Sequence, residues 1–317
     1  MLVSILIPCY NAERWVAEAI ESALAQTWQD KEVIVVDDGS QDRSLDIIKS
    51  FGDRIRWEAG PNRGGNMARN RLLEMAKGEW LQYLDADDYL LPPKIERQVA
   101  FLRNHPECDI VYSPVWMVNW SEEKVEQEIT PIPEPHDPWI LLARWWLPQT
   151  GGPLWNRESI INAGGWRPDQ PCCQEHELYL RLLKSGANFC YFDDCNSAYR
   201  NWSKDKTVSK RNKPEVRRQR LIIKESAEEF LALQGELTWS RLQALNQGRF
   251  EIARMAWLED QLAATEIVST IQQRQPKFLP EGPAARGRYR WIFQTFGFAM
   301  AERIAELKRK FSGMELA

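Results

Sequence analysis

The first 112 residues alternate between short apolar runs and segments with helical periodicity. The apolar runs are rich in β-branched residues and stop at polar or turn-forming residues, as buried strands do. These runs cover residues 2–8, 31–36, 54–58, 79–84 and 109–112. The segments between them predict helices over 12–26, 42–51 and 65–77, and a fourth that begins near Pro92 and Pro93. Strands and helices that alternate in this way predict βαβ units in a mainly parallel α/β sheet, with helices on both faces.

The pattern changes after residue 113. Residues 113–170 contain a cluster of four prolines between 131 and 138 and a high density of tryptophan, without a clear period. Helical spacing returns at 174–185, and a strand is predicted at 187–193. From about residue 214 the chain is predicted to be helical, with a break at 275–283. We therefore expect an α/β domain at 1–212 and a helical C-terminal extension at 213–317.

Composition narrows the class of protein. The 317 residues are 44% hydrophobic and 27% charged, which excludes disordered, collagen-like and coiled-coil chains. No apolar run approaches the roughly 18–20 residues of a membrane-spanning helix, and residues 2–7 lack the basic flank of a signal peptide. We expect the fold to begin at residue 2 and the protein to be cytoplasmic. The six cysteines contain no C-x-x-C pair, so reduced thiols are expected, and three histidines make a histidine-based zinc site an unfavourable interpretation.

Charge is distributed unevenly along the chain. Residues 1–199 carry 19 Lys and Arg against 31 Asp and Glu, whereas residues 200–317 carry 22 against 14. The first part is therefore acidic and the second basic. This argues against a nucleic-acid partner bound to one broad basic face. It suits a protein that holds a cation in one part and meets phosphate or an anionic surface with the other.

Polar clusters follow three of the predicted strands, at residues 8–11, 37–40 and 85–88. In parallel sheets, ligands bind beyond the carboxyl ends of the strands, where these clusters would lie. The cluster Asp85-Ala86-Asp87-Asp88 crowds three carboxylates, which repel one another unless a cation lies among them. A divalent ion that keeps positions open for phosphate oxygens fits this cluster. A solvated acidic turn before the next helix is the alternative.

Asp38 and Arg69 each have two interpretations, one as a ligand-binding residue and one as a structural residue. Asp38 can accept the N–H of a pyrimidine base, but Asp-Gly-Ser at 38–40 is also an ordinary turn. Arg69 offers a guanidinium near a helix N-terminus, where anions bind, or it is an exposed arginine at the start of a helix. The P-loop, dinucleotide-binding and nucleophile-elbow glycine motifs are all missing from the sequence.

Taken together, the ordered motifs over about residues 2–210 resemble family 2 of the glycosyltransferases. The matching segments are Val3–Asn11, Val35–Ser40, Asn62–Asn70, Gly78–Asp88, Gly164–Trp166 and Glu175–Leu182. The resemblance implies a GT-A nucleotide-sugar fold, in which a Rossmann-like and mainly parallel sheet forms the catalytic domain. It also implies a hexosyltransferase-type enzyme (EC 2.4) that transfers a sugar from a UDP-sugar with inversion.

The same resemblance assigns roles to individual residues. Asp87 would coordinate Mn²⁺ or Mg²⁺ that bridges the diphosphate of the donor. The residues that would bind the nucleotide sugar are Pro8, Tyr10, Asp38, Arg69, Asp85 and Ala86.

Two positions depart from the family pattern. Glu175 aligns with the aspartate that is the usual catalytic base, and Gln174 stands where the family has glutamate. Glu175 is therefore the candidate base, although a glutamate at a helix N-terminus, like Glu177, is also favoured by the helix dipole alone. Trp202 stands where many relatives have a histidine that helps to hold the metal or the diphosphate, and the basic stretch after it is a candidate substitute.

The tryptophans of residues 116–166 could stack on sugar rings, although large aromatic side chains more often belong to the core. Residues 286–311 combine Arg and Lys with an aromatic-rich helical pattern. Such a helix either contacts a membrane surface peripherally, here the inner face of the membrane, or docks on the catalytic domain or on another subunit of a homo-oligomer.

We therefore expect a metal-dependent inverting glycosyltransferase. It would move a sugar from a nucleoside diphosphate sugar to a hydroxyl of a saccharide or lipid-linked acceptor in glycan or polysaccharide biosynthesis. Two alternatives stay open. One is a glycosyltransferase-like binding or assembly subunit without activity, and the other is a nucleotidyltransferase, for which residues 7–12 lack basic side chains.

Overall fold

The computed structural model describes residues 1–120, 125–202 and 212–312. The chain divides into two compact units. The N-terminal unit comprises residues 1–142 and 146–211, and the C-terminal unit comprises residues 143–145 and 212–317. The fold of each unit follows separately.

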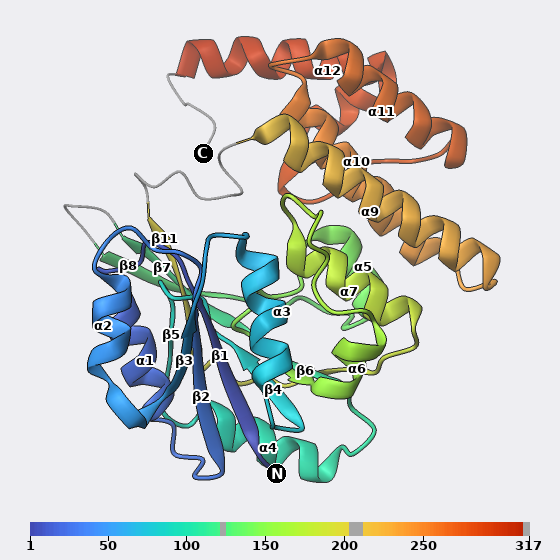
Figure 1. Cartoon of the computed structure of the whole chain (residues 1–317). Coiled ribbons are helices and arrows are strands. Elements are labelled where there is room, and N and C mark those ends of the chain that lie inside the picture. Colours follow the sequence, from blue (N-terminus) through green and yellow to red (C-terminus); the bar gives the residue numbers. More distant parts are fainter. Residues whose placement is uncertain (121–124, 203–211, 313–317) are drawn as a thin grey trace. The chain divides into compact units, whose positions relative to one another are not determined.

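A seven-stranded sheet forms the centre of the N-terminal unit (Figure 1). Its order is β10-β6-β9-β4-β1-β2-β3, and every neighbouring pair is parallel except the two that involve β9. The strands are β1 (Val3–Cys9), β2 (Lys31–Asp37), β3 (Arg56–Ala59), β4 (Trp80–Tyr83), β6 (Ile110–Tyr112), β9 (Leu154–Asn156) and β10 (Phe189–Tyr191). The prediction of a mainly parallel α/β sheet is confirmed.

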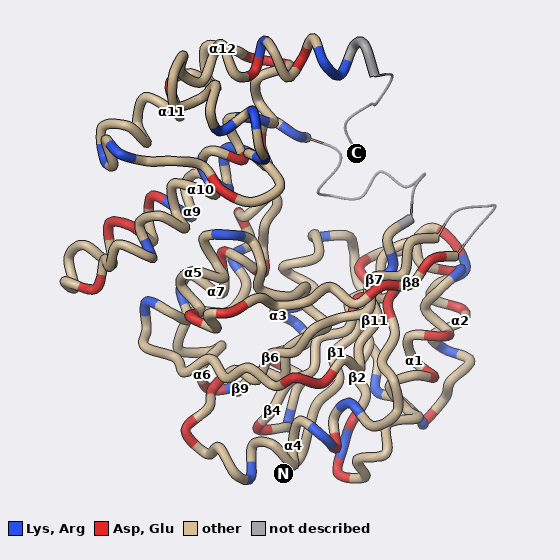
Figure 2. The backbone as a smooth tube through the Cα atoms, turned by 180° about the vertical axis from the view of Figure 1, so that it is seen from behind, with Lys and Arg blue, Asp and Glu red and all other residues tan. Residues whose placement is uncertain are grey.

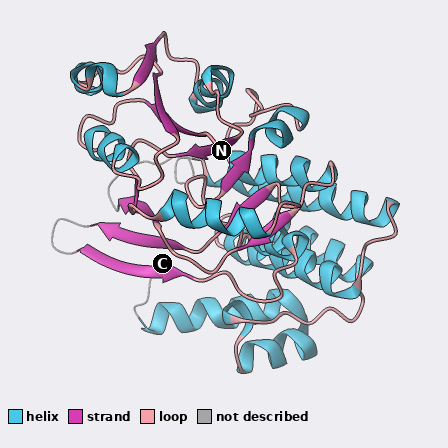
Figure 3. Ribbon diagram, turned by 90° about the horizontal axis from the view of Figure 1, so that it is seen from below, coloured by secondary structure: helices cyan, strands magenta, loops and turns pink. Residues whose placement is uncertain are grey.

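Helices cover the two faces of this sheet (Figure 3). The first four are α1 (Val16–Leu24), α2 (Ser44–Ser50), α3 (Gly65–Met75) and α4 (Lys94–Asn104), and a 3₁₀ turn, η1 (Gly52–Arg54), follows α2. The chain runs from β1 to β2 to β3 in one direction and returns past β1 to β4. Because such crossovers are right-handed, α1 and α2 lie on one face and α3 lies on the other. The apolar core between the sheet and α1, α2 and α4 includes Val3, Ile5, Ile20, Ile48 and Val99.

A second, four-stranded sheet was not predicted from the sequence. Its order is β5-β11-β7-β8, from β5 (Tyr89–Leu90), β11 (Ser197–Trp202), β7 (Val115–Trp120) and β8 (Val125–Thr130). β8 is exposed along its whole length and contains three acidic or amide side chains, so it lacks the apolar alternation that marks a strand. β7 and β11 pair in parallel although about 80 residues separate them.

The remaining helices of the region after β8 are α5 (Pro138–Arg144), α6 (Arg157–Asn162) and α7 (Gln174–Lys184). The helix predicted at 174–185 is thus confirmed, as are the strands predicted near 109–112 and 187–193. The Asn156 side chain caps α6 by accepting the Ser159 N–H. Trp155 and Trp166 are fully buried, which places both in the core rather than at a surface where a sugar ring could stack on them.

The C-terminal unit is helical, as predicted. It contains α9 (Lys213–Leu233), α10 (Trp239–Ala256), α11 (Gln261–Arg274), the 3₁₀ turn η2 (Pro283–Ala285) and α12 (Arg288–Ser312). The predicted break at 275–283 separates α11 from η2. Phe250 lies at the centre of an aromatic core with Phe278, Phe293 and Phe298. Among the described residues, no helix combines the length and the apolar character needed to cross a bilayer.

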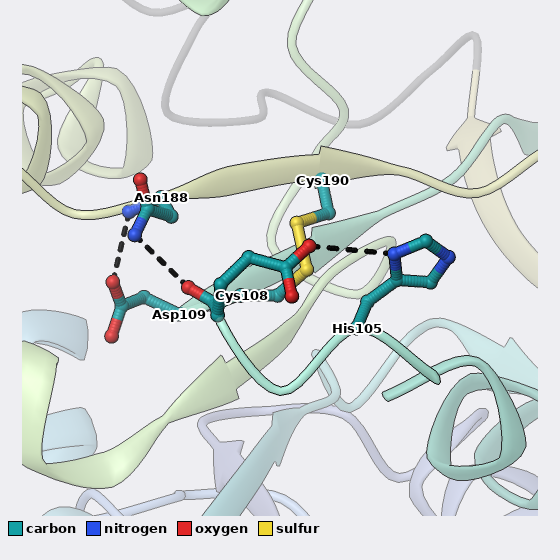
Figure 4. Close-up of a disulfide and its surroundings, with 6 residues drawn as sticks. His105, Cys108, Asp109, Asn188 and Cys190 are labelled. Atoms are coloured by element: carbon teal, nitrogen blue, oxygen red, sulfur yellow. Dashed lines mark hydrogen bonds and ion pairs between the residues drawn. A yellow bond between two sulfur atoms is a disulfide. The ribbon is translucent and has the colours of Figure 1, made fainter. Parts of the chain in front are cut away.

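The expectation that all six cysteines are reduced is wrong for one pair. Cys108 and Cys190 form a disulfide beside the paired strands β6 and β10 (Figure 4). Asn188 reinforces the same junction, because its backbone N–H donates to Asp109 and its side chain donates to the Glu107 carbonyl. The two cysteines are 82 positions apart in the chain, so only the pairing of the strands brings them together.

Candidate functional site

The polar clusters that follow β1, β2 and β4 lie side by side at one edge of the large sheet. β1 lies between β4 and β2, with Cys9 opposite Asp37. The Asp38 N–H donates to the Cys9 carbonyl at 2.8 Å, and the Leu84 N–H donates to the Leu6 carbonyl at 2.9 Å. The strand order reverses at β1, which is where open α/β sheets bind their ligands. The structure thus brings the three predicted clusters to one place.

Asp38 holds the loop that leads into α3. Its two carboxylate oxygens accept the backbone N–H groups of Arg63 at 2.8 Å and Gly64 at 2.9 Å. Gly39, with φ +75°, packs against the same loop, and a Cβ atom there would lie 2.6 Å from the Asn62 nitrogen. The turn after β2 therefore requires glycine. The Asp38 carboxylate is engaged by the protein, so a ligand could use only its remaining lone pairs.

Pro8, Tyr10 and Ala86 surround this edge in different environments. Pro8 is partly buried near the end of β1, and Tyr10 follows β1 with its ring half exposed. Ala86 is buried, and its methyl group belongs to the core formed with α1 and α4. Tyr10 can therefore offer its ring to a ligand, whereas Ala86 can offer only its backbone.

Arg69 on α3 reaches across to the acidic turn after β4. Its guanidinium donates to Asp85 at 2.7 Å and lies over the Trp166 ring, 4.9 Å from the ring centre. Burial disfavours the charged guanidinium, but the negative charges of Asp85 and Glu175 outweigh it and raise the pKa of Arg69. Arg69 thus binds Asp85 directly and also experiences the negative charge of Glu175.

Two asparagines of α3 hold the segment that precedes α7. Asn70 accepts the Trp166 N–H at 2.8 Å and donates to the Trp166 carbonyl at 2.7 Å. Asn66 donates to the Arg167 and Gln170 carbonyls. A Cβ atom at Gly165 would lie 2.8 Å from the Asn70 side-chain oxygen. This explains why glycine precedes Trp166, and it shows how α3 places the N-terminus of α7.

The acidic turn is clamped by Arg200 on β11, a residue that the sequence did not single out. The backbone N–H of Arg200 donates to the Asp88 carboxylate at 2.8 Å, and the Arg200 guanidinium donates to the backbone carbonyl of Asp87 at 2.9 Å. The guanidinium also pairs with Glu18 of α1 at 2.6 Å and lies over the rings of Trp15 and Tyr89. Of the three clustered carboxylates, Asp88 is therefore structural.

Asp87 is the carboxylate of this turn that remains available. Its side chain is accessible to solvent and forms no ion pair within the described part of the chain. Loss of hydration to the surrounding protein, followed by the charge of Asp85, raises the pKa of Asp87 to about 6. A hard divalent cation would relieve this repulsion, and carboxylate oxygens are its preferred ligands. Asp87 therefore fits the metal that the sequence predicts, and Asp85 beside it is bound by Arg69.

Glu175 and Glu177, both in the first turn of α7, have different surroundings. Glu177, 9% exposed, is bound by the guanidinium of Arg181 at 2.8–3.0 Å, and Arg181 also donates to the Ala163 and Gly165 carbonyls. Glu175, 24% exposed, lies 3.3 Å from His176 Nδ1.

Glu175 shares the environment of the acidic turn. Burial opposes its ionisation, but His176 beside it and Arg69 more than offset the burial and lower the pKa of Glu175. Tyr199 on β11 is affected by both regions. Burial, followed by the charges of Asp88, Asp87, Asp85 and Glu175, raises the pKa of its hydroxyl. Glu175 is thus an ionised carboxylate close to Arg69, Tyr199 and the acidic turn.

Two sequence-based expectations concern the Trp202 side chain and the basic residues 204–211, which lie outside what the structure describes.

Among the described residues, Glu107, Cys108 and Cys190 form a group with ligand atoms close enough for a metal. Both of its sulfur atoms belong to the disulfide (Figure 4), so this group does not fit a metal.

A hydrophobic pattern could not have revealed Arg200 or Tyr199, because their role depends on the second sheet.

Known proteins resemble both the sequence and the fold. Residues 4–153 match the family described as glycosyl transferase family 2. An uncharacterized glycosyltransferase of Rickettsia typhi is 43% identical over 110 residues, which are 35% of this chain and 35% of that protein. The chain thus spans about a third of the length of this curated relative.

Two solved structures share the fold. S. aureus TarS 1–349 in complex with UDP-GlcNAc matches with a TM-score of 0.60 and 14% identity, over 98% of this chain and 92% of TarS 1–349. The mannosyltransferase PcManGT of Pyrobaculum calidifontis, in complex with GDP-Man and Mn²⁺, matches with a TM-score of 0.52 and 15% identity, over 99% of this chain and 88% of PcManGT. At these identities the likeness shows the fold alone.

Proposed function

Since this chain belongs to glycosyltransferase family 2 through its N-terminal domain, we propose that it is a metal-dependent inverting transferase. It would move a sugar from a nucleoside diphosphate sugar, here a UDP-sugar, to a hydroxyl of a saccharide or lipid-linked acceptor. The UDP-GlcNAc bound by TarS and the GDP-Man and Mn²⁺ bound by PcManGT support a nucleotide sugar and a divalent metal as ligands of the shared fold.

One observation carries this proposal. Arg69 joins two carboxylates with different tasks, because it binds Asp85 directly and also experiences the negative charge of Glu175. For a sugar donor whose diphosphate binds at the acidic turn, the Glu175 carboxylate would be the base that takes the proton of the acceptor hydroxyl. The alternative base, Glu177, is occupied by Arg181.

Each residue has a distinct part in the proposed reaction. Asp87 would hold Mn²⁺ or Mg²⁺, which when bound offsets the charge of the departing diphosphate, and Asp85 would lie along the donor. The Glu175 carboxylate would accept the proton of the acceptor hydroxyl as that oxygen attacks the anomeric carbon. Tyr10 would pack against the nucleobase of the donor. Asp38 would orient the loop at 62–64 beside the nucleobase. Direct attack by the acceptor oxygen requires no covalent enzyme intermediate.

Partners and location are also proposed. We place the protein in the cytoplasm, with peripheral contact to the inner membrane face through the basic C-terminal helix. Such a location would suit a lipid-linked acceptor, which presents its hydroxyl at a membrane surface.

The experiment that tests the function is release of free nucleotide from a panel of UDP- and GDP-sugars. Purified full-length protein is incubated with each sugar, with and without Mn²⁺, and water serves as the acceptor where no saccharide is supplied. Metal-dependent release of UDP supports the proposal. Binding of UDP-sugar without any release, across saccharide acceptors as well as water, would instead indicate a binding or assembly subunit.

A further inference from the structure

The last helix of the C-terminal unit has a buried face and an apolar exposed face. After Gly297, where φ is +80° and the helix is interrupted, Phe298 and Ala301 point into the core of the unit. Met300, Ile304 and Leu307 are exposed and follow one another at spacings of four and three residues. Side chains at this spacing lie on one side of a helix.

Two exposed aromatic residues lie in the helical segment that precedes the interruption. Trp291 is 60% exposed and Phe296 is 59% exposed, and their rings are in contact with centres 5.8 Å apart. We call Trp291, Phe296, Met300, Ile304 and Leu307 the α12 apolar surface. Large exposed apolar side chains that gather on one helix mark an interaction site.

Lys and Arg outnumber Glu along α12, whose positions are coloured by residue type in Figure 2. Its exposed charged residues in the described part of the chain are Arg288, Arg290, Arg303 and Lys308. No ion pair of these four occurs among the described residues. The acidic Glu302 is fully buried, where it binds Arg254 and accepts the Tyr289 hydroxyl at 2.6 Å. Burial of Glu302 removes its negative charge from the surface, so that Glu306, which is partly exposed, is the one acidic side chain of the described part of α12 that accompanies the four basic ones.

We propose that α12 binds the surface of a bilayer that contains anionic phospholipid. The α12 apolar surface would enter the boundary between headgroups and acyl chains, and the four basic residues would contact lipid phosphates. A helix that combines exposed Trp and Phe with a net positive set of exposed Arg and Lys matches such a boundary, whereas the core of a protein interface is depleted of charge. This inference rests on the membrane contact proposed above and gives it residues and a class of lipid. Vesicle binding is measured without transferase activity, so it can fail while the proposed reaction holds.

The test is co-flotation of the full-length protein with vesicles. Vesicles of phosphatidylcholine alone are compared with vesicles that contain 30% phosphatidylglycerol, at low and high NaCl. We expect binding to the anionic vesicles that weakens at high salt. The variant Arg290→Gln/Arg303→Gln should bind about fivefold more weakly for each charge removed. The variant Ile304→Ser/Leu307→Ser should lose most binding at either salt concentration.

Matched controls separate a specific surface from general stickiness. Leu233→Ser/Leu262→Ser removes two apolar side chains of α9 and α11 that are more exposed still, and Arg43→Gln/Arg54→Gln removes two positive charges from the N-terminal unit. Both controls should bind vesicles like the parent, and thermal melts should show that every variant is folded.

Three outcomes would overturn the proposal. The parent protein could ignore anionic vesicles, or the α12 variants could bind as well as the parent. The third outcome is a concentration-dependent dimer that Ile304→Ser/Leu307→Ser abolishes while vesicle binding is absent, which would make α12 a contact between two copies of the chain.

Discussion

The choice between Glu175 and Glu177 as the base yields opposite predictions for two closely similar variants. Glu175→Gln keeps the size of the side chain and removes its ability to take a proton. If Glu175 is the base, transfer should fall by about 10²–10⁴-fold, since this is the range that a positioned general base contributes. Glu177→Gln should keep most of the activity.

Stability should change in the reverse order. Glu177 is nearly buried and binds Arg181 through contacts of 2.8–3.0 Å. Its replacement by a neutral amide weakens charge-assisted hydrogen bonds and leaves Arg181 partly unpaired. We expect a loss of about 1–3 kcal/mol in the free energy of unfolding. For a domain of about 200 residues this lowers the melting temperature by roughly 2–10 °C.

Glu175→Gln should lower stability less than Glu177→Gln. His176 and Arg69 outweigh the burial of Glu175 and lower its pKa, so the neutral amide loses a net stabilisation at neutral pH. Burial opposes the charge and limits this loss, and Arg69 retains its bond to Asp85.

The assay measures nucleotide release from the active UDP-sugar together with a thermal melt of each variant. Stabilisation by UDP and Mn²⁺ is recorded in parallel, because donor binding should survive both substitutions. The reasoning is refuted if Glu175→Gln releases nucleotide at the parent rate, or if Glu177→Gln loses activity while its melting temperature stays the same.

Three further predictions concern the metal site, its support and the disulfide. Asp87→Asn should abolish Mn²⁺-dependent stabilisation by UDP, which amounts to about 2.7 kcal/mol at a ligand concentration of 100 Kd. The melting temperature of this variant without ligand should equal or exceed that of the parent. The surroundings of Asp87 raise its pKa to about 6, so its charge is unfavourable in the folded protein and the neutral amide avoids that cost. An unchanged stabilisation by UDP and Mn²⁺ would contradict the assignment of Asp87. Arg200→Met should weaken the affinity for Mn²⁺ in the presence of UDP about tenfold but preserve UDP binding without metal. Arg200→Lys should restore part of the affinity for Mn²⁺. Equal Mn²⁺ affinity in the parent and in both variants would exclude a positioning role for Arg200. Reduction of the Cys108–Cys190 disulfide, which closes a loop across 82 positions, should lower the free energy of unfolding by about 2–4 kcal/mol, whereas a Cys108→Ser/Cys190→Ser variant should not respond to the reductant.

Local patterns along the chain were sufficient for six of the seven strands of the large sheet and for the position of the candidate site, but they missed β9 (Leu154–Asn156). A buried strand needs a continuous apolar run, and a covering helix needs apolar residues three and four apart, so both are visible without tertiary information. The carboxyl ends of parallel strands meet at one edge, which predicted that the groups at 8–11, 37–40 and 85–88 would lie together. The structure has this arrangement.

The sequence alone could not separate residues of the same type. The three carboxylates at 85–88 are all aspartates, so the sequence does not distinguish their roles. In the structure Arg200 binds Asp88 and Arg69 binds Asp85, which leaves Asp87 for a cation. The assignment of Asp87 and Glu175 to metal binding and catalysis stays a prediction until the variants are measured.

The remaining features depend on contacts between segments that are far apart in the chain. β11 joins β7 across about 80 residues, and Cys108 finds Cys190 across 82. No local period records such pairings, because a strand's own side chains show only which of its faces is buried. The pattern of apolar and polar residues thus determined where the sheet and its candidate site are, and tertiary packing decided which charges at that edge are paired within the protein and which are not.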